Sequence, residues 1–156
     1  TQQKAIELSK MDNICILCGH YEGVDQRLLE EYQAEEISVG DYVLTGGELP
    51  AMVVADAVAR MVPGVLPDPE CFQEESHYSG MLEYPQYSRP ETWHSRTVPP
   101  ILRSGNHALV ARWRRKQSLL RTWLRRPDLY EKLDLTSKED QKLLSELREE
   151  CPEFQG

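Results

Sequence analysis

Glycines concentrate in two loops whose main chain could bind a ligand. Five of the nine glycines lie between residues 17 and 50: Gly19, Gly23, Gly40, Gly46 and Gly47. They follow apolar runs at residues 14–18 and 42–44, and glycine lets the main chain adopt positive φ and approach a ligand closely. A helical run separates the two loops, so the pattern predicts a pocket lined by main chain. A pair of tight turns that bind nothing is the alternative.

Basic side chains concentrate in residues 103–126, where eight of the 18 lysines and arginines lie and no acid occurs. The net charge of −8 disfavours nucleic acid as a partner, but this uneven distribution favours a local phosphate-binding patch. Helical spacing places Arg114, Arg121 and Arg125 on one face and Arg112 and Lys116 on another, with Arg115 in the same run. Such runs are often only solvated faces; the lack of acids favours RNA binding.

The sequence gives little support for a metal site or for a catalytic nucleophile. Cys15 and Cys18 form a C-x-x-C, but they lie within I-C-I-L-C-G, an expected buried strand, and no second pair accompanies them. We interpret them as buried, reduced thiols and predict no metal site. The chain also lacks the G-x-S-x-G, H-E-x-x-H and G-x-x-x-x-G-K-[ST] motifs.

The amino-acid sequences of the two loops indicate a particular family more specifically than their glycine content does. C-G-H-Y-E-G-V-D and S-V-G-D-Y-V-L-T-G-G-E-L-P-A resemble bacterial tRNA (guanine-N1)-methyltransferases, the trefoil-knotted enzymes of SPOUT type that methylate guanosine 37. The resemblance continues through V-P-G-V-L, L-E-Y-P-Q-Y-S-R-P, V-P-P-I-L and W-R-R-K-Q-S to L-R-R-P-D-L, roughly residues 15–129. Members of the family carry a further N-terminal portion, so we expect this chain to be a fragment, the C-terminal part of such an enzyme.

The resemblance implies S-adenosylmethionine as the methyl donor. Its expected contacts are Gly19, Tyr21, Glu22, Val39, Gly40, Asp41, Tyr42, Val43, Leu44, Gly46, Gly47 and Pro50. Main-chain N–H and C=O groups can read the adenine edge, and glycine lets them approach it. Core packing is the alternative for Tyr42 and Leu44.

Methyl transfer to guanine N1 needs a donor held in line and a base for the N1 proton. Glu75 occupies the position where many relatives carry an aspartate, so the resemblance makes it the expected base, with Glu74 as the rival. Arg60 matches an active-site arginine and could stabilise charge on guanine O6. His20 neighbours the site without an assigned role. Without the resemblance, Glu75 would read as a solvated acid in an acidic loop.

The elements that position these groups alternate in type. We expect a short helix within residues 1–12, a buried strand at 13–18, a helix at 24–33 and extended pieces at 37–39 and 42–44. A helix should begin at Pro50, with a stripe of Ala51, Ala55 and Ala59 that permits close helix packing inside the fold or between subunits.

The second half reads as irregular and then helical. Residues 63–80 read as a loop, residues 84–100 carry four prolines, and Tyr84, Tyr87 and Trp93 are expected in the core rather than stacked on bases. Asn106 should cap a helix that ends at Pro127. Its buried stripe is predicted as Leu109, Trp113, Leu120 and Leu124. A capping box at residues 136–139 should start a last helix, with Leu143, Leu144 and Leu147 buried and Pro152 as its end.

These observations predict an α/β fold. It comprises a partial trefoil-knot (SPOUT-type) parallel sheet layer at residues 1–66, a linker at 67–84 and a small all-helical tRNA-binding domain at 85–156. The expected function is S-adenosylmethionine-dependent methylation of tRNA at N1 of guanosine 37, by a homodimer. No apolar run reaches the roughly 20 residues of a membrane span, and Thr1 to Lys10 has no signal-peptide core, so a cytoplasmic location is expected. The alternatives are a noncatalytic RNA-binding module or a knotted methyltransferase with another RNA target.

Overall fold

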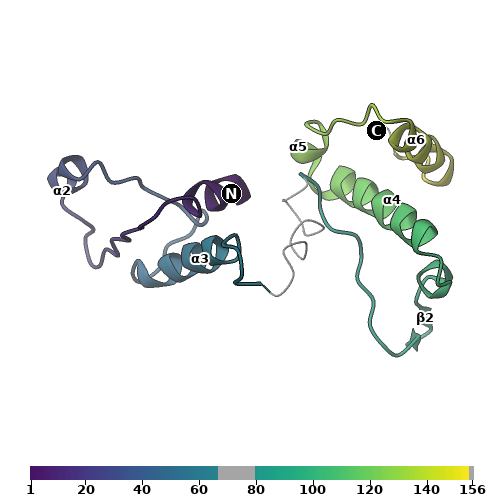
Figure 1. The fold of residues 1–156 in the computed structure, drawn as a ribbon, viewed down its shortest axis with the longest axis horizontal. Coiled ribbons are helices and arrows are strands. Elements are labelled where there is room, and N and C mark those ends of the chain that lie inside the picture. Colours follow the sequence, from purple (N-terminus) through teal and green to yellow (C-terminus); the bar gives the residue numbers. More distant parts are fainter. Residues whose placement is uncertain (67–79, 155–156) are drawn as a thin grey trace. The chain divides into compact units, whose positions relative to one another are not determined.

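The computed structural model describes residues 1–66 and 80–154, and the chain divides into two compact units, Thr1–Cys71 and Phe72–Gly156 (Figure 1). The first unit contains α1 (Gln2–Leu8), α2 (Gln26–Glu31) and α3 (Glu48–Ala59). The second contains β1 (Thr92–Trp93), β2 (Arg96–Thr97), the 3-10 helix η1 (Pro100–Arg103), α4 (His107–Arg125), α5 (Pro127–Tyr130) and α6 (Lys138–Glu150). Among the described residues, no helix combines the length and apolar character that a membrane crossing requires.

The core of the first unit lies between α1 and α3. Ala5 and Leu8 of α1 and Val58 of α3 are buried there, and Val54, Ala57 and Met61 pack around them. Thr1 caps α1 by accepting a hydrogen bond from the Lys4 N–H. The short helix predicted within residues 1–12 is confirmed, and it covers one side of α3.

Helix α3 begins at Glu48, two residues before the predicted start at Pro50. Gly47 is its N-cap residue, and the Gly47 carbonyl accepts from the Ala51 N–H at 3.0 Å. Pro50 is therefore the third helical residue, a position whose N–H has no partner within a helix in any case. The predicted start is wrong by half a turn because proline is tolerated at several first-turn positions.

The strand predicted at residues 13–18 is not formed. Ile14, Ile16 and Leu17 are 42%, 44% and 54% exposed, instead of buried in a sheet. A strand requires a neighbour to complete its hydrogen-bond ladder, and no described segment of this unit provides one. The pieces expected at 37–39 and 42–44 also lack strand pairing, so apolar sequence without a partner stays irregular.

Helix α2 is shorter than the predicted 24–33 and buries none of its residues. Asp25 caps it by accepting from the Arg27 N–H at 2.9 Å. Leu28 is 41% exposed and Tyr32 77% exposed, so the apolar face that we expected to pack does not do so within this unit. The alanine stripe of α3 behaves similarly, because Ala55 and Ala59 are exposed while α1 packs on Val54, Ala57 and Val58.

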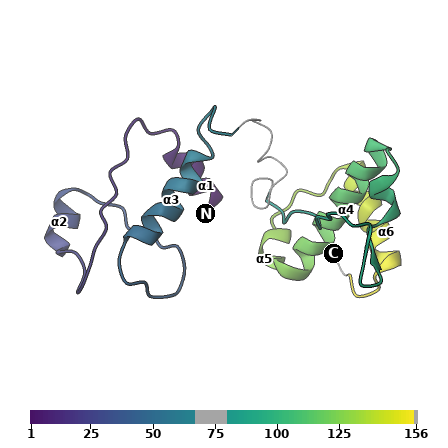
Figure 2. The same ribbon diagram turned by 90° about the horizontal axis from the view of Figure 1, so that it is seen from below.

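The core of the second unit forms where α4 packs against α5 and α6 (Figure 2). The predicted leucines of α6, Leu143, Leu144 and Leu147, are buried against Leu119 of α4. Phe154 closes the cluster, with its ring 5.0 Å from that of Trp123. Met81, which we placed in the linker, is also buried in this core.

The buried side of α4 differs from the predicted stripe. Leu109 and Leu124 are 47% and 59% exposed, whereas Leu119 and Thr122 are fully buried. Thr122 Oγ1 accepts from the Leu82 N–H at 2.9 Å, and its hydroxyl donates to the Ser118 carbonyl at 2.7 Å. The segment at residues 81–82 and helix α6 cover this side, and contacts so distant in sequence are not encoded in the helical period.

The ends of the helices follow local chemistry. Asn106 caps α4, with its Oδ1 accepting from the Leu109 N–H at 3.2 Å, and α4 ends before Pro127, as predicted. The capping residue of α6 is Ser137 rather than Thr136, because Ser137 Oγ accepts from the Asp140 N–H while Thr136 bonds to Asp134. The predicted capping box is therefore wrong by one residue. Helix α6 ends at Glu150, ahead of Pro152, as expected.

A tight hairpin interrupts the region that we expected to be irregular. In it β1 pairs antiparallel with β2, with Thr92 opposite Thr97 and Trp93 opposite Arg96. His94 and Ser95 have φ of 46° and 65°, the left-handed values that a two-residue hairpin turn requires. Trp93 is 61% exposed, so the prediction that it packs in a core is wrong.

Candidate functional site

The two glycine loops meet in the first unit. The Gly47 N–H donates to the Gly19 carbonyl at 3.0 Å. A Cβ atom built on Gly47 would lie 2.7 Å from Cys18 Cα, closer than any side chain tolerates. Only glycine therefore permits this approach, which brings the two loops together at Gly19 and Gly47.

A side-chain contact reinforces the junction of the loops. His20 hydrogen-bonds through Nε2 to Oε1 of Glu48, the first residue of α3, and this hydrogen bond lowers the pKa of the Glu48 carboxyl. Sequence reasoning left His20 without a role and missed Glu48, although G-G-E directly precedes the helix. The contact ties the first loop to the start of α3.

The other expected cofactor contacts are spread over the unit. Val39 lines a separate hollow of about 210 Å³ between α1 and α3. The Tyr42 ring lies beside Gly40, and its hydroxyl donates to the Val39 carbonyl at 3.4 Å. Tyr21 and Val43 are fully exposed. Glu22, Asp41 and Leu44 are also exposed, and Pro50 lies in the first turn of α3.

The catalytic candidates occupy different places. Arg60 is the C-cap residue of α3, and its N–H donates to the Asp56 carbonyl at 3.1 Å. Glu75 and its rival Glu74 lie outside the described residues. The structure therefore places one of the two catalytic candidates.

The arginine-rich helix α4 has two electrostatically different sides. On the side facing α6, Arg112 pairs with Glu146 at 2.6 Å and Lys116 pairs with Glu150 at 2.6 Å. Arg115 pairs with Asp140 through two hydrogen bonds of 3.0 and 3.2 Å. Three of the basic residues thus hold α6 against α4, and for Arg112 and Arg115 the predicted RNA contact competes with these intramolecular ion pairs.

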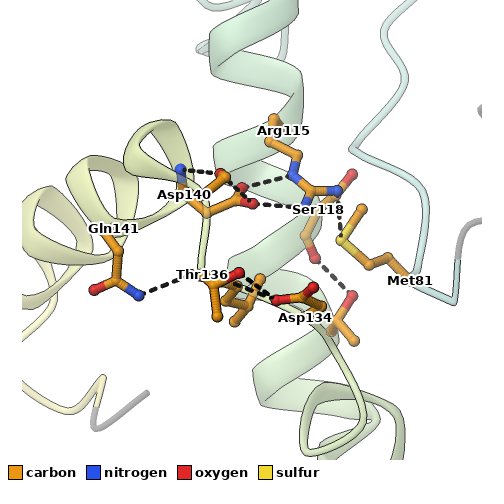
Figure 3. Close-up of polar contacts among 10 residues, drawn as sticks. Met81, Arg115, Ser118, Asp134, Thr136, Asp140 and Gln141 are labelled. Atoms are coloured by element: carbon orange, nitrogen blue, oxygen red, sulfur yellow. Dashed lines mark hydrogen bonds and ion pairs between the residues drawn. The ribbon is translucent and has the colours of Figure 1, made fainter.

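Figure 3 shows how the Arg115–Asp140 pair is embedded. The Ser137 hydroxyl donates to Asp140 Oδ2 at 2.8 Å, and Arg115 also reaches the sulfur of Met81 at 3.3 Å. Burial raises the pKa of the Asp140 carboxyl, but the hydrogen bonds from Arg115 and Ser137 outweigh burial and leave that pKa below its ordinary value. The network joins α4, the start of α6 and the segment around Met81.

The opposite side of α4 carries Arg114, Arg121 and Arg125, as predicted from their spacing. The guanidinium of Arg114 lies 4.6 Å from the centre of the Tyr84 ring. Nε of Arg121 is shielded from solvent and makes no hydrogen bond with any described residue. Arg125 is exposed. We call these three residues the basic face.

A groove adjoins the basic face and was not anticipated from the sequence. It has a volume of about 1090 Å³ and lies between residues 84–91 and the first half of α4, where it includes Val110 and Arg114. Val98, Leu102 and Arg103 complete its wall. The segment P-Q-Y-S-R-P, with two aromatic or basic side chains between prolines, was the available signal.

Metal ligation is absent from the part of the chain that the structure describes. There, no three His, Cys, Asp or Glu side chains are grouped so that they could hold an ion. Cys15, Cys18 and Cys151 are free thiols. Cys15 is exposed, so the expectation of buried thiols is wrong for it, because the strand that would have buried it is not formed.

Comparison with known proteins gives a consistent result. The family model described as tRNA (Guanine-1)-methyltransferase TrmD matches residues 1–132. The tRNA (guanine-N(1)-)-methyltransferase of Alkaliphilus oremlandii is 55% identical over 147 residues, which cover 94% of this chain and 59% of that protein. Those of Ruminiclostridium cellulolyticum and Staphylococcus aureus are 57% and 52% identical, over 85% and 90% of this chain. These relatives are longer, and the chain spans 57–59% of their length.

Proposed function

Because the chain belongs to the tRNA (guanine-1)-methyltransferase TrmD family, we propose that it is part of an enzyme that methylates N1 of guanosine 37 in tRNA. The observation that carries the proposal is the family match over residues 1–132, which include both glycine loops and the basic face. We further propose that the whole protein has the trefoil knot of the SPOUT type, works as a homodimer and acts in the cytoplasm, where its tRNA substrate is found.

The proposed methyl donor is S-adenosylmethionine, which supplies an electrophilic methyl group when bound. We place this ligand at the junction of the glycine loops, because Gly47 and Gly19 bring main-chain groups of both loops together there. Gly19, Gly46 and Gly47 would hold it, with residues 39–44 reading its adenine edge. The fully exposed Val43 and Tyr21 are available to cover the ligand.

For the target base we propose two roles. Glu75 accepts the N1 proton as the new bond to carbon forms, because N1 is a weak nucleophile while it is protonated. Arg60 donates hydrogen bonds to O6, where negative charge accumulates as the proton leaves. The proton goes to the carboxylate, and the methyl group replaces it on N1.

The proposed tRNA contact is the basic face of α4. Five other basic residues of the 103–126 stretch are paired with acids inside the unit: Arg103, Arg112, Arg115, Lys116 and Arg126. Arg121 and Arg125 make no ion pair with a described residue, which supports their assignment to phosphates.

The test is methylation of a tRNA transcript by the full-length protein. We expect 1-methylguanosine at position 37 after nuclease digestion and mass spectrometry, and none in a transcript with adenosine at that position. Methylation elsewhere would indicate another RNA target. Binding of tRNA without methylation, at saturating S-adenosylmethionine, would support the noncatalytic module instead.

A further inference from the structure

The groove beside α4 lies wholly within the second unit and is independent of the glycine loops. Its α4 residues, Val110 and Arg114, lie on the other side of the helix from Arg112, since Arg112 and Arg114 are roughly 200° apart around the axis. The groove therefore faces away from α6. Its volume of about 1090 Å³ exceeds the usual small-ligand pocket of roughly 300–1,000 Å³, so it has room for a nucleotide with flanking backbone.

The charged lining of the groove is positive. Among the described residues, its charged lining consists of Arg89, Arg103, Arg114 and the acid Glu91. Glu91 pairs with Arg103, so these two charges offset each other. Arg89 is exposed and makes no hydrogen bond or ion pair with a described residue. An anionic ligand fits this balance of charges.

Aromatic rings line the same groove. Tyr87 is 48% exposed, and the centre of its ring lies 6.3 Å from that of the tilted Trp113 ring. Tyr84 lies beneath the guanidinium of Arg114. Exposed aromatic rings beside arginines are the combination on which unpaired nucleic-acid bases stack.

Main-chain donors complete the lining. The N–H groups of Gln86, Tyr87, Ser88 and Arg89 donate to no other residue that the structure describes. These residues follow one another along the irregular, exposed stretch that lines the groove. A groove built from donors and rings selects a ligand rich in acceptors and flat surfaces, such as a nucleotide. An acidic peptide would use the arginines but has no need of the rings.

We propose that this groove binds one unstacked nucleotide of the substrate RNA, with its base on Tyr87 and its phosphate on Arg89. The inference rests on the proposed tRNA substrate and names a second contact with it. Arg121 and Arg125 continue the track beyond Arg114, over about 16 Å of helix at roughly 1.5 Å per residue. The backbone that leaves the groove follows this basic face.

Substitutions of Arg89 and of Tyr87 should affect tRNA binding by the full-length protein in different ways. Arg89→Ala should weaken binding and reduce the slope of log K against log salt by about one unit, because one phosphate contact is lost. Arg89→Lys should restore most of that slope. Tyr87→Leu should weaken binding roughly 5- to 150-fold and leave the slope unchanged, because stacking releases no counterions.

Lys142→Ala is the matched control, since Lys142 is an exposed cation on α6, which packs on the other side of α4. A second measurement is photocrosslinking of 4-thiouridine-substituted tRNA to the unaltered protein, with the peptide containing residues 84–91 as the expected product. Unchanged affinity and slope in Arg89→Ala and Tyr87→Leu, or crosslinks that avoid this peptide, would overturn the inference. If the protein binds tRNA through the groove but forms no 1-methylguanosine, only the proposed function fails.

Discussion

At the scale of single residues, the most consequential ionised group in the second unit is Asp140. Asp140 is 7% exposed, and its carboxylate accepts hydrogen bonds from Arg115 and from the Ser137 hydroxyl. The contact with Ser137 helps to fix the start of α6. Because these contacts hold its pKa below the ordinary value, they stabilise the fold wherever the carboxylate is ionised in both states. This stabilisation is present above the unfolded pKa of about 3.9 and is lost as the pH falls through the folded pKa.

We predict that Asp140→Asn lowers the free energy of unfolding at pH 7 by about 1.5–3 kcal/mol, the range for hydrogen bonds to charged groups. The difference from the unaltered protein should shrink below about pH 4, where the native carboxylate also becomes neutral. Tryptophan fluorescence in urea measures it, because all three tryptophans lie in the second unit. Glu139→Gln, at the exposed neighbouring position, should change little; an equal loss there would contradict the assignment.

A second prediction at this scale concerns the proposed base. In the full-length enzyme, Glu75→Gln should lower the single-turnover rate by about 10²–10⁴-fold, because the amide cannot accept the N1 proton. Affinities for S-adenosylmethionine and tRNA should stay nearly unchanged. Glu75→Asp should retain part of the rate, and Arg60→Ala should lower it. Glu74→Gln is the control, and its failure in place of Glu75→Gln would transfer the role to Glu74.

At the scale of elements, α4 has one side packed against α6 and the basic face on the opposite side. Leu119 is fully buried while Leu124 is 59% exposed, although both are leucines of the same helix. Leu119→Ala should cost about 2–5 kcal/mol of unfolding free energy, the range for a buried leucine, and Leu124→Ala should stay within about 0.5 kcal/mol. The denaturant midpoints of the two variants measure this difference in unfolding free energy. Equal losses would mean that α4 packs in the orientation that its leucine spacing first indicated.

The proposed contact of the basic face with tRNA predicts how binding depends on salt. Replacing Arg114, Arg121 and Arg125 by alanine should weaken tRNA binding regardless of tRNA sequence and flatten the salt slope by about one unit per lost phosphate contact. Binding titrations between low and moderate salt measure this slope. A triple variant that keeps the original slope would show that the basic face is only solvated.

At the scale of the whole molecule, the apolar surface of the first unit is the main feature. Met52 and Val53 of α3 are 67% and 56% exposed, and Ala55 and Ala59 are exposed beside them. Helix α3 is apolar on several sides, but among the described elements it packs against α1, so part of its apolar surface is left uncovered within its own unit. This supports the proposal that α3 also packs against a second subunit in the full-length protein.

We therefore predict that Ala55→Phe weakens the dimer of the full-length protein by overpacking, at a cost on the order of 1–3 kcal/mol. Sedimentation velocity over a concentration series measures the shift toward monomer. Ala34→Phe, at another exposed alanine of the same unit, is the control. Identical sedimentation of Ala55→Phe and the unaltered protein would place the alanine stripe in solvent.

Features set by neighbouring residues could be predicted from the sequence alone. Asn106 caps α4 and Pro127 ends it, because a capping oxygen and a missing N–H act within one turn. Leu143, Leu144 and Leu147 are buried as a stripe because α6 has a clear polar side. The resemblance to the family also rests on short local sequence motifs.

Features that depend on distant partners were decided by the tertiary structure. Helical periodicity fixes the angles between the side chains of α4 but not the direction from which Leu82 and α6 approach, so the predicted buried stripe was wrong. Spacing grouped Arg112 with Lys116, yet only the position of Glu146 and Glu150 shows that their charges are used internally. The apolar run at residues 13–18 has strand composition, but a strand exists only where another main chain completes its hydrogen bonds.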